Sequence, residues 1–373
     1  MLERLEAIDW SALHHAYGPA DDVPELLRAL LSTDDEIRGR AWEALYGNVV
    51  HQGTVWEATP HVVPFLIEIL EAREGPDPAR VLRYLAALAG GTGDEGDEGD
   101  DGSMYDDAPD LLRHRGAPGL TRAAVGRGLD VYREHLRSPD AGCRTEAANL
   151  LAMIPVETSA ELLQAYRAET DEVARAAMLW SLRVAPSDEQ DVPDALSSPS
   201  ALVRLVAALS MLRRDPSDRA LAVIAEALSD PASVPRYSEL PMACSRVELD
   251  IAHHIGAAPP FAPGVVLPAL IASMHRLSGP APFVATGIVA AILHLVFEPV
   301  DWAHFDPRRV ERRARSELSP AQLEVLHELL RARSMWGEAG RRNGTLASHL
   351  HPRRLPSDWD ALRDYLGAVV GSS

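Results

Sequence analysis

The chain contains no lysine, so all 36 of its basic residues are arginines. This absence excludes sites that depend on an amine side chain, such as a P-loop, a Schiff base or a lysine general base. Against the arginines stand 55 acidic residues, which give a net charge of −19. Acids alternate with arginines along most of the chain, and only residues 301–373 are mildly basic, with 12 arginines and 10 acids. Such a surface repels nucleic acids and anionic membranes.

Cysteines, aromatic residues and long apolar runs are also scarce. Cys143 and Cys244 give no disulfide framework, and aromatic residues make up only 5% of the chain, so we expect an aliphatic core. The longest apolar stretch, residues 282–297, is too short for a comfortable membrane span and contains His294. The N-terminal residues show no apolar signal run. We therefore expect a cytoplasmic protein that does not enter a membrane.

Helical periodicity runs along nearly the whole chain. Leucine and alanine dominate, and short turns rich in Pro, Gly, Ser and Asp separate the apolar patterns. No stretch shows sustained strand alternation, so the sequence predicts an all-α protein. The predicted helices span residues 23–32, 34–47, 61–72, 79–89, 120–136, 144–154, 160–168, 172–184, 201–213, 219–228, 245–255, 264–277, 284–297, 320–334 and 358–368.

Three central segments repeat one pattern, and each ends near a proline. They read "SPDAGCRTEAANLLAMIP" (138–155), "ETDEVARAAMLWSLRVAP" (169–186) and "SPSALVRLVAALSMLRRDP" (198–216). Ala147, Ala177 and Ala207 match at intervals of 30 residues, and Ala41 occupies the same place in an earlier copy. A small residue there lets stacked helices approach closely. The pattern predicts an α-solenoid of about eight to ten stacked antiparallel helix pairs.

These segments resemble the short HEAT-like repeats first described in phycobilisome lyases. The repeat pattern D-x-x-V-R-x-x-A-x-x-x-L is seen here as "DEIRGRAWEAL" and "SALVRLVAALSML". In addition, "AIDWSALHHAYGPADDVPELLRAL" followed by "LYGNVVHQGTVWEATPHVVPFLIEIL" is similar to the amino-terminal part of a group of actinobacterial HEAT-repeat proteins. The resemblance implies a fold and no particular reaction.

Two interruptions divide the predicted array. Residues 90–110 carry nine acids and no base, a composition typical of a flexible loop, and residues 229–264 are rich in proline. We expect N-terminal helical pairs over 1–91, an acidic flexible loop over 92–110, central repeats over 111–230 and divergent repeats over 231–373. Replacing residues 92–108 by a short Gly-Ser linker is expected to leave the melting temperature nearly unchanged.

The segment "GNVVHQGTVWEATP" (47–60) departs from the helical composition. Gly47 is expected to end the preceding helix, and residues 48–54 to form a loop. Thr59 is expected to cap the next helix, with Pro60 at its first position. If the helix began at Trp56 instead, Glu57 would share a face with a histidine four residues later.

Three interpretations of this segment stay open. In the first it is a structural corner, where amide side chains satisfy backbone groups and the tryptophan fills the end of a repeat. In the second it is a surface that binds a partner or a ligand, with His51, Gln52 and Glu57 as the contact residues, and in the third it is a catalytic site. The candidate binding residues are Tyr46, Asn48, His51, Gln52, Trp56, Glu57 and His61.

Metal-binding patterns are weak. The histidine pairs 14–15 and 253–254 are adjacent in sequence, and neighbours on a helix point about 100° apart, so neither pair chelates as an i, i+4 couple does. The chain has neither HExxH nor a His-Glu dipeptide, and only Cys244, Asp250 and His254 offer a combination of ligands. We assign no metal, no cofactor and no catalytic residue.

The leading functional hypothesis is a scaffold that binds another protein or a peptide on a concave surface. A first alternative is an enzyme or small-molecule-binding protein with a pocket near residues 47–61 or 250–254. A second is a nucleic-acid-binding HEAT-like protein, which the charge disfavours. A deep pocket at either segment would favour the first alternative, and a broad shallow groove would favour the scaffold.

Overall fold

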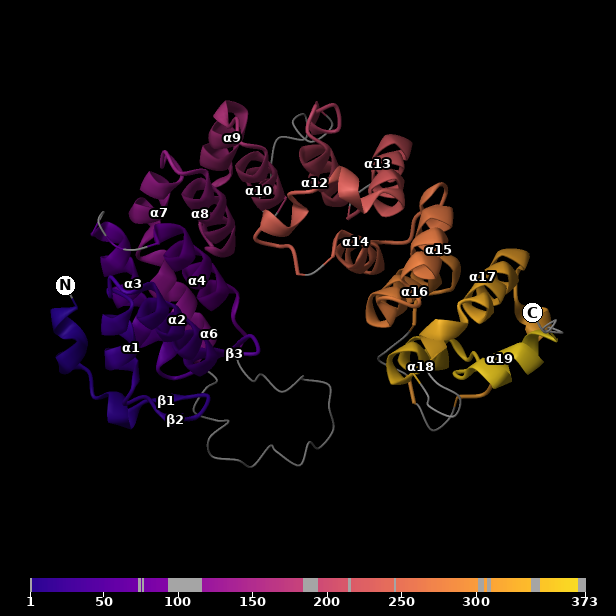
Figure 1. Ribbon diagram of the computed structural model, residues 1–373, viewed down its shortest axis with the longest axis horizontal. Coiled ribbons are helices and arrows are strands. Elements are labelled where there is room, and N and C mark those ends of the chain that lie inside the picture. The colour runs from indigo at the N-terminus through magenta and orange to yellow at the C-terminus, as the bar shows by residue number, and fades with distance from the viewer. Residues whose placement is uncertain are drawn as a thin grey trace. The chain divides into compact units, whose positions relative to one another are not determined.

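The computed structural model is predominantly α-helical, which confirms the all-α prediction (Figure 1). It describes residues 2–72, 75, 77–92, 116–183, 194–213, 216–244, 246–300, 305–306, 310–336 and 343–367. Apart from Thr92, the predicted acidic loop lies outside these residues. The chain forms two compact units, residues 1–187 and 188–373, each described by itself.

The first unit combines helices with two short hairpins. Two 3₁₀ turns, Glu3–Ala7 and Trp10–Ala12, precede the first hairpin. Its elements then follow as β1 (His14–His15), β2 (Gly18–Pro19), α1 (Val23–Ala29), α2 (Asp35–Val49), β3 (Val50–His51), β4 (Thr54–Val55), α3 (Thr59–Glu71), α4 (Pro78–Gly90), α6 (Ala117–Gly126), α7 (Leu129–His135), α8 (Ala141–Met153), α9 (Ser159–Ala168) and α10 (Glu172–Leu182).

The second unit has helices and no strand among its described residues. Its α-helices are α12 (Ala201–Met211), α13 (Asp218–Ser229), α14 (Val247–Gly256), α15 (Val266–Leu277), α16 (Pro282–Val296), α17 (Pro320–Arg331), α18 (Gly344–Leu350) and α19 (Trp359–Leu366). Short 3₁₀ turns lie between them at Pro231–Ser233, Tyr237–Glu239, Arg315–Glu317, Arg333–Trp336 and His351–Arg353.

Four helices begin with the same hydrogen-bonded turn. The N-cap side chains of α2, α8, α10 and α12 accept backbone N–H groups of the first helical turn, and the caps are Asp34, Asp140, Asp171 and Ser200. An arginine stands four residues after each cap. In three of the turns its Nη1 donates to the carbonyl of the serine two residues before the cap, at 2.7, 2.9 and 2.8 Å for Arg38, Arg144 and Arg204.

The caps correct the predicted repeat register. Asp140, Asp171 and Ser200 lie 31 and 29 residues apart (171 − 140 and 200 − 171), so the spacing is not a uniform 30. Counted from its cap, the seventh residue of α8 and α12 is the predicted alanine, but the seventh residue of α10 is Met178. The predicted match of Ala177 is therefore wrong by one residue. The cap and its arginine set the register of each helix. The alanine pattern misled because α10 has small residues on more than one side.

The helices of the first unit pack in a row around aliphatic side chains. Helix α8 packs against α4 on one side and α10 on the other, while α3 packs on α6 (Figure 1). Leucines and alanines of α4, α8 and α10 are fully buried, as the low aromatic content predicted. In the second unit, α13 packs on α12 and α15, and α16 packs on α14 and α15.

One predicted helix, 120–136, is broken. It forms α6 and α7 with Arg127 and Gly128 between them. Buried Tyr132 folds back over Gly128, where an added Cβ would lie 2.4 Å from the tyrosine oxygen, and its hydroxyl donates to the carbonyl of Val125 at 2.9 Å. The tyrosine thus fixes the break by tying α7 to the end of α6.

Candidate functional site

Residues 47–60 form a helix end, a hairpin and a helix start. Gly47 is not a helix cap, because α2 continues to Val49 and the Val50 N–H still bonds to the Tyr46 carbonyl. The chain reverses at Gln52 and Gly53, whose φ angles of 52° and 89° suit the tight two-residue turn between β3 and β4. The expected loop over 48–54 is therefore wrong: α2 continues through its first two residues and a hairpin follows, whose two-residue strands are too short to show alternation.

Helix α3 begins at Thr59, so Thr59 is the first helical residue rather than the cap. Its hydroxyl accepts the Trp56 N–H at 2.8 Å and donates to the Val49 carbonyl at 2.7 Å. One side chain thus closes both ends of the hairpin. Because Glu57 precedes the helix, it does not pair with His61 across a helical turn, and its Oε2 lies 3.4 Å from His14 Nδ1 instead.

The first hairpin, β1–β2, adds side chains that the sequence-based patch lacked. His15 Nδ1 accepts the Tyr17 N–H at 3.1 Å, so the neutral ring carries its proton on Nε2 and donates to Asp22 Oδ1 at 3.0 Å. The other Asp22 oxygen accepts from Asn48 Nδ2 at 2.7 Å. Asp22 therefore joins the first hairpin to the end of α2.

Tyr17 and His51 form the exposed tip of this corner. Their rings meet edge to face with centroids 5.3 Å apart, and the Tyr17 hydroxyl lies 3.2 Å from His51 Nδ1. The Tyr17 side chain is 69% exposed, and Gln52 is exposed beside it on the hairpin turn. We call Tyr17, His51 and Gln52 the corner tip.

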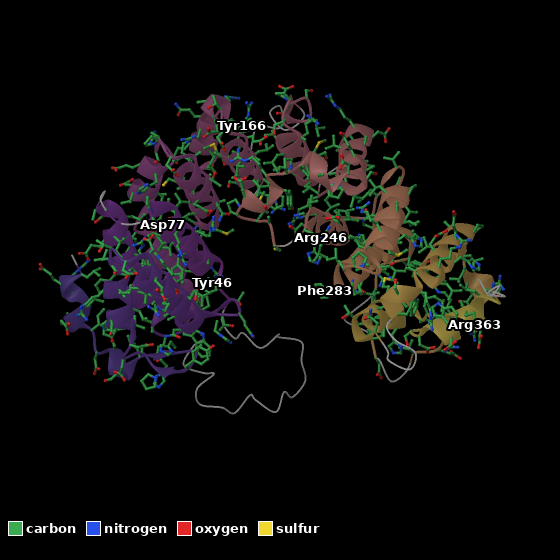
Figure 2. The ribbon with its side chains drawn as sticks, viewed as in Figure 1. Tyr46, Asp77, Tyr166, Arg246, Phe283 and Arg363 are labelled. Atoms are coloured by element: carbon green, nitrogen blue, oxygen red, sulfur yellow. The ribbon has the colours of Figure 1, made fainter. Side chains whose placement is uncertain are left out.

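The structure brings together only part of the predicted patch. Asn48, His51 and Glu57 belong to the corner, whereas Tyr46 projects from α2 and packs its ring against Tyr84 of α4 (Figure 2). Trp56 is half-buried, and His61 is exposed on α3. The predicted binding role of these residues stays a prediction.

At the second predicted location, residues 250–254, the Asp250 side chain makes a hydrogen bond within the protein. Asp250 is buried, and its Oδ2 accepts the Cys244 N–H at 3.1 Å. Burial and the neighbouring Asp250 carboxylate raise the pKa of the Cys244 thiol. Among the described residues, no three His, Cys, Asp or Glu side chains are grouped so that they would hold a metal ion.

A cleft of about 360 Å³ opens between α7, α8, α9 and α10. Leu136 and Met178 are buried apolar residues of its wall, and Arg144 and Glu169 are its most buried charged residues. Around these lie Arg137, Glu161, Gln164, Ala165, Ala168 and Thr170. We call this space the interhelix cleft. Its size is within the range of sites that hold a small ligand or one side chain of a partner.

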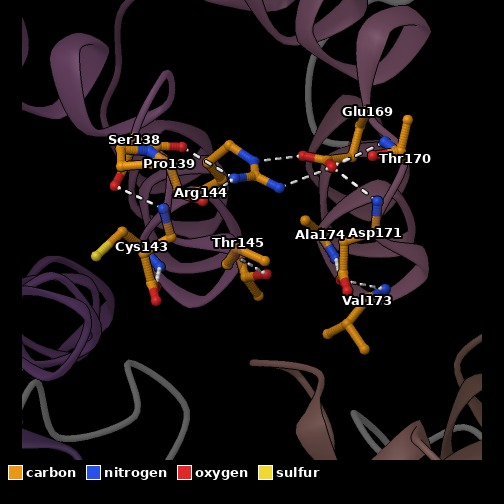
Figure 3. Close-up of polar contacts among 12 residues, drawn as sticks. Ser138, Pro139, Cys143, Arg144, Thr145, Glu169, Thr170, Asp171, Val173 and Ala174 are labelled. Carbon is orange, nitrogen blue, oxygen red and sulfur yellow. Dashed lines mark hydrogen bonds and ion pairs between the residues drawn. The ribbon is translucent and has the colours of Figure 1, made fainter.

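A closed network joins the two turns at the cleft (Figure 3). Arg144 donates from Nε and Nη2 to the two oxygens of Glu169, at 2.7 and 2.9 Å, and from Nη1 to the carbonyls of Ser138 and Pro139. Glu169 also accepts the N–H groups of Thr170 and Asp171 at 2.8 Å each. Glu169 thus takes the position of the serine in the equivalent turns and binds the arginine of the preceding turn as well.

The network determines the charge states of its members. Burial alone would raise the pKa of Glu169, whose side chain is 4% exposed, but hydrogen bonds from Arg144, Asp171 and Thr170 outweigh burial and lower it. The Glu169 carboxylate raises the pKa of Arg144 in return. Both groups are therefore charged near neutral pH.

Comparison of the chain with protein-family models, curated proteins and solved structures gives no match. Among the described residues, no helix has both the length and the apolar character to cross a membrane. The cleft and the corner therefore have to be interpreted from their own geometry.

The sequence contained a signal for the cleft. Arg144 belongs to a repeated pattern. The other copies of this turn have serine at the position of Glu169. The glutamate therefore adds a negative charge beside the arginine of the neighbouring copy. The involvement of α9 could not be inferred in the same way, because its cleft residues fall on an ordinary amphipathic pattern.

Proposed function

We propose that the chain is a HEAT-like helical-repeat scaffold that binds a protein or peptide partner. The helix pairs would form an α-solenoid, with a surface between successive pairs available to the partner. The recurring turn of cap and arginine before α2, α8, α10 and α12 supports the repeat assignment. So does the packing of α8 between α4 and α10.

The observation that carries the proposal is the interhelix cleft. It opens between the pair α7–α8 and the pair α9–α10, where repeat proteins offer a surface built from neighbouring units. Its side chains combine apolar and hydrogen-bonding groups, which suits a side chain presented by another protein. By contrast, the equivalent arginine in the second unit, Arg204, lines a space of only about 10 Å³.

Blocking the cleft tests this proposal. Ala168 is exposed at the end of α9 and lines the cleft, so Ala168→Trp places a large ring there without entering the core. Ala160, exposed near the start of the same helix, provides the matched control Ala160→Trp. Tagged full-length protein is used for affinity capture from native lysate, and bound proteins are identified by mass spectrometry.

We expect a partner that is retained by the wild type and by Ala160→Trp but lost with Ala168→Trp. A partner lost instead with Tyr17→Ala or His51→Ala would move the binding surface to the corner tip. Capture that none of these variants changes would contradict the proposed role of both surfaces. Circular dichroism of each variant confirms that it has folded.

A further inference from the structure

Resting on the proposed function, we propose that the interhelix cleft receives an arginine or lysine side chain from a basic segment of the partner protein. The proposal identifies the partner by its charge. It depends on the walls of the cleft, on the hydrogen-bonding capacity left at its carboxylates and on the charge around it.

The cleft has the two zones that a long cationic side chain needs. Buried Leu136 and Met178 give an apolar wall for the aliphatic stem. Glu161, Gln164 and Thr170 place oxygen atoms around it for the charged head. A small ligand that carries a carboxylate but no aliphatic stem would leave this apolar wall uncovered.

Two carboxylates retain acceptor capacity. Glu161 Oε1 binds Arg133 Nη2 at 2.9 Å, while Glu161 Oε2 is buried with no hydrogen-bond partner among the described residues. Glu169 Oε2 accepts a bond from Arg144 Nε and has a second lone pair. An incoming N–H donor would satisfy groups that the chain itself leaves open.

The four charged residues that line the cleft, Arg137, Arg144, Glu161 and Glu169, balance one another, and the acidic excess lies in the segment that carries α9. Residues 157–172, which include α9, contain five acids and one arginine, a net charge of −4. The facing segment 130–144 contains three acids and three arginines and is neutral. The whole chain carries −19, which attracts a basic partner over distance and repels an acidic one.

Of the two arginines that line the cleft, Arg144 is paired with Glu169, and Arg137 is the one whose charge opposes an incoming cation. Its Nη1 donates to the Arg133 carbonyl at 3.0 Å, which holds the guanidinium back along the end of α7. Since Arg137 is exposed, its charge can be removed without disturbing the core. The proposal therefore predicts that removing this charge strengthens binding.

The test is a titration of the full chain with a fluorescein-labelled hexa-arginine peptide, followed by fluorescence anisotropy at physiological salt. Glu161→Gln is expected to weaken binding about 5- to 10-fold, because a charge-assisted hydrogen bond is lost. Arg137→Gln is expected to strengthen binding about 3-fold, since a like charge is removed. Glu43→Gln, on an exposed position of α2, removes one acid elsewhere and is expected to change binding less than about 2-fold.

Gln164→Arg, on the exposed face of α9, introduces a competing cation without touching the core and should also weaken binding. Equal effects of Glu161→Gln and Glu43→Gln would overturn the proposal, as would weaker binding by Arg137→Gln. If Ala168→Trp still abolishes capture of a cellular partner in that case, the scaffold function stands and only the basic character of its ligand is wrong.

Discussion

At the scale of single residues, backbone strain marks the corner tip. Gln52 has a φ of 52°, a left-handed conformation that asparagine and glycine adopt more readily than glutamine. The turn would form at lower cost with either residue. A glutamine held there is therefore explained better by an outward role of its side chain than by the fold.

Gln52→Gly is accordingly expected to stabilise the chain by about 0.5–1 kcal/mol, because the strain is removed at a position where glycine is compatible. Urea denaturation of the two proteins measures the difference. A loss of stability would show that the glutamine side chain makes contacts that hold the hairpin, and the structural-corner interpretation would then gain support.

Glu169 makes the free energy of unfolding depend on pH in the acidic range. Its folded pKa is lowered, so its contribution is complete above the unfolded value of about 4.3 and is lost as the pH falls through that value towards the folded pKa. Glu169→Gln should be less stable than the wild type at pH 7. The difference should remain constant down to about pH 5 and shrink below about pH 4.3.

Glu146 provides a control of opposite sign. It is buried on α8 and bonded to Arg83 of α4 at 2.6 and 2.8 Å, yet burial dominates and raises its pKa. Its contribution is therefore complete below the unfolded pKa and is lost as the pH rises through the folded one. Relative to Glu146→Gln, the wild type should gain stability on acidification, and the same pH dependence in both variants would contradict the assignment.

At the scale of helices, equivalent turns allow matched comparisons. Arg144 and Arg204 both donate to the serine and proline carbonyls of their turns, but within the described part of the chain only Arg144 also binds a buried carboxylate. Arg144→Ala should cost about 3 kcal/mol, because it leaves Glu169 buried without its cation. Arg204→Ala should cost about 1 kcal/mol. Equal losses in thermal or urea denaturation would show that the carboxylate adds nothing.

Close packing of the helix row gives a further prediction. Ala147 in α8 and Ala207 in α12 are fully buried, and Ala177 in α10 is nearly so. Replacing any of them by leucine should destabilise the chain by about 1–3 kcal/mol through overpacking. Exposed Ala160 in α9 provides the control, and Ala160→Leu should be nearly silent. A silent Ala147→Leu would contradict the tight packing of α8.

The helices were predictable because their periodicity is local information. The predicted starts and ends of α4, α9 and α13 lie within a residue or two of those observed. The break at Gly128 was not predictable, because it depends on Tyr132 folding back onto a chain reversal. The hairpins were missed because two-residue strands show no pattern. Tyr17 and Asp22 were missed because they reach the corner from elsewhere in the chain, Tyr17 from the first hairpin and Asp22 from the start of α1.

At the scale of the whole molecule, the boundary between the two compact units differs from the predicted domain boundaries, and the acidic residues are unevenly distributed along the chain. The division at residues 187 and 188 falls inside the predicted central segment 111–230, so that segment contributes to both compact units. Nine of the acids lie within residues 90–110, and the dispensability of residues 92–108 for folding stays a prediction.

Residues 1–187 are expected to fold when expressed alone, because the helices and buried side chains of this unit contact one another. The fragment should show a helical circular dichroism spectrum and a cooperative thermal transition. A fragment of residues 1–140, which ends before α8 and so lacks the helix between α4 and α10, is the control and should be much less stable. The absence of a cooperative transition in residues 1–187 would show that the second unit is required.

The shared carboxylate of Glu169 has a kinetic consequence. One oxygen of this residue closes the turn before α10, and both oxygens bind the arginine that closes the turn before α8. Neither turn reaches its full stability until the other has formed, so we expect α8 and α10 to open together in hydrogen exchange, as a single foldon does. We also expect the first unit to order early around these two coupled turns, with the helices on either side following.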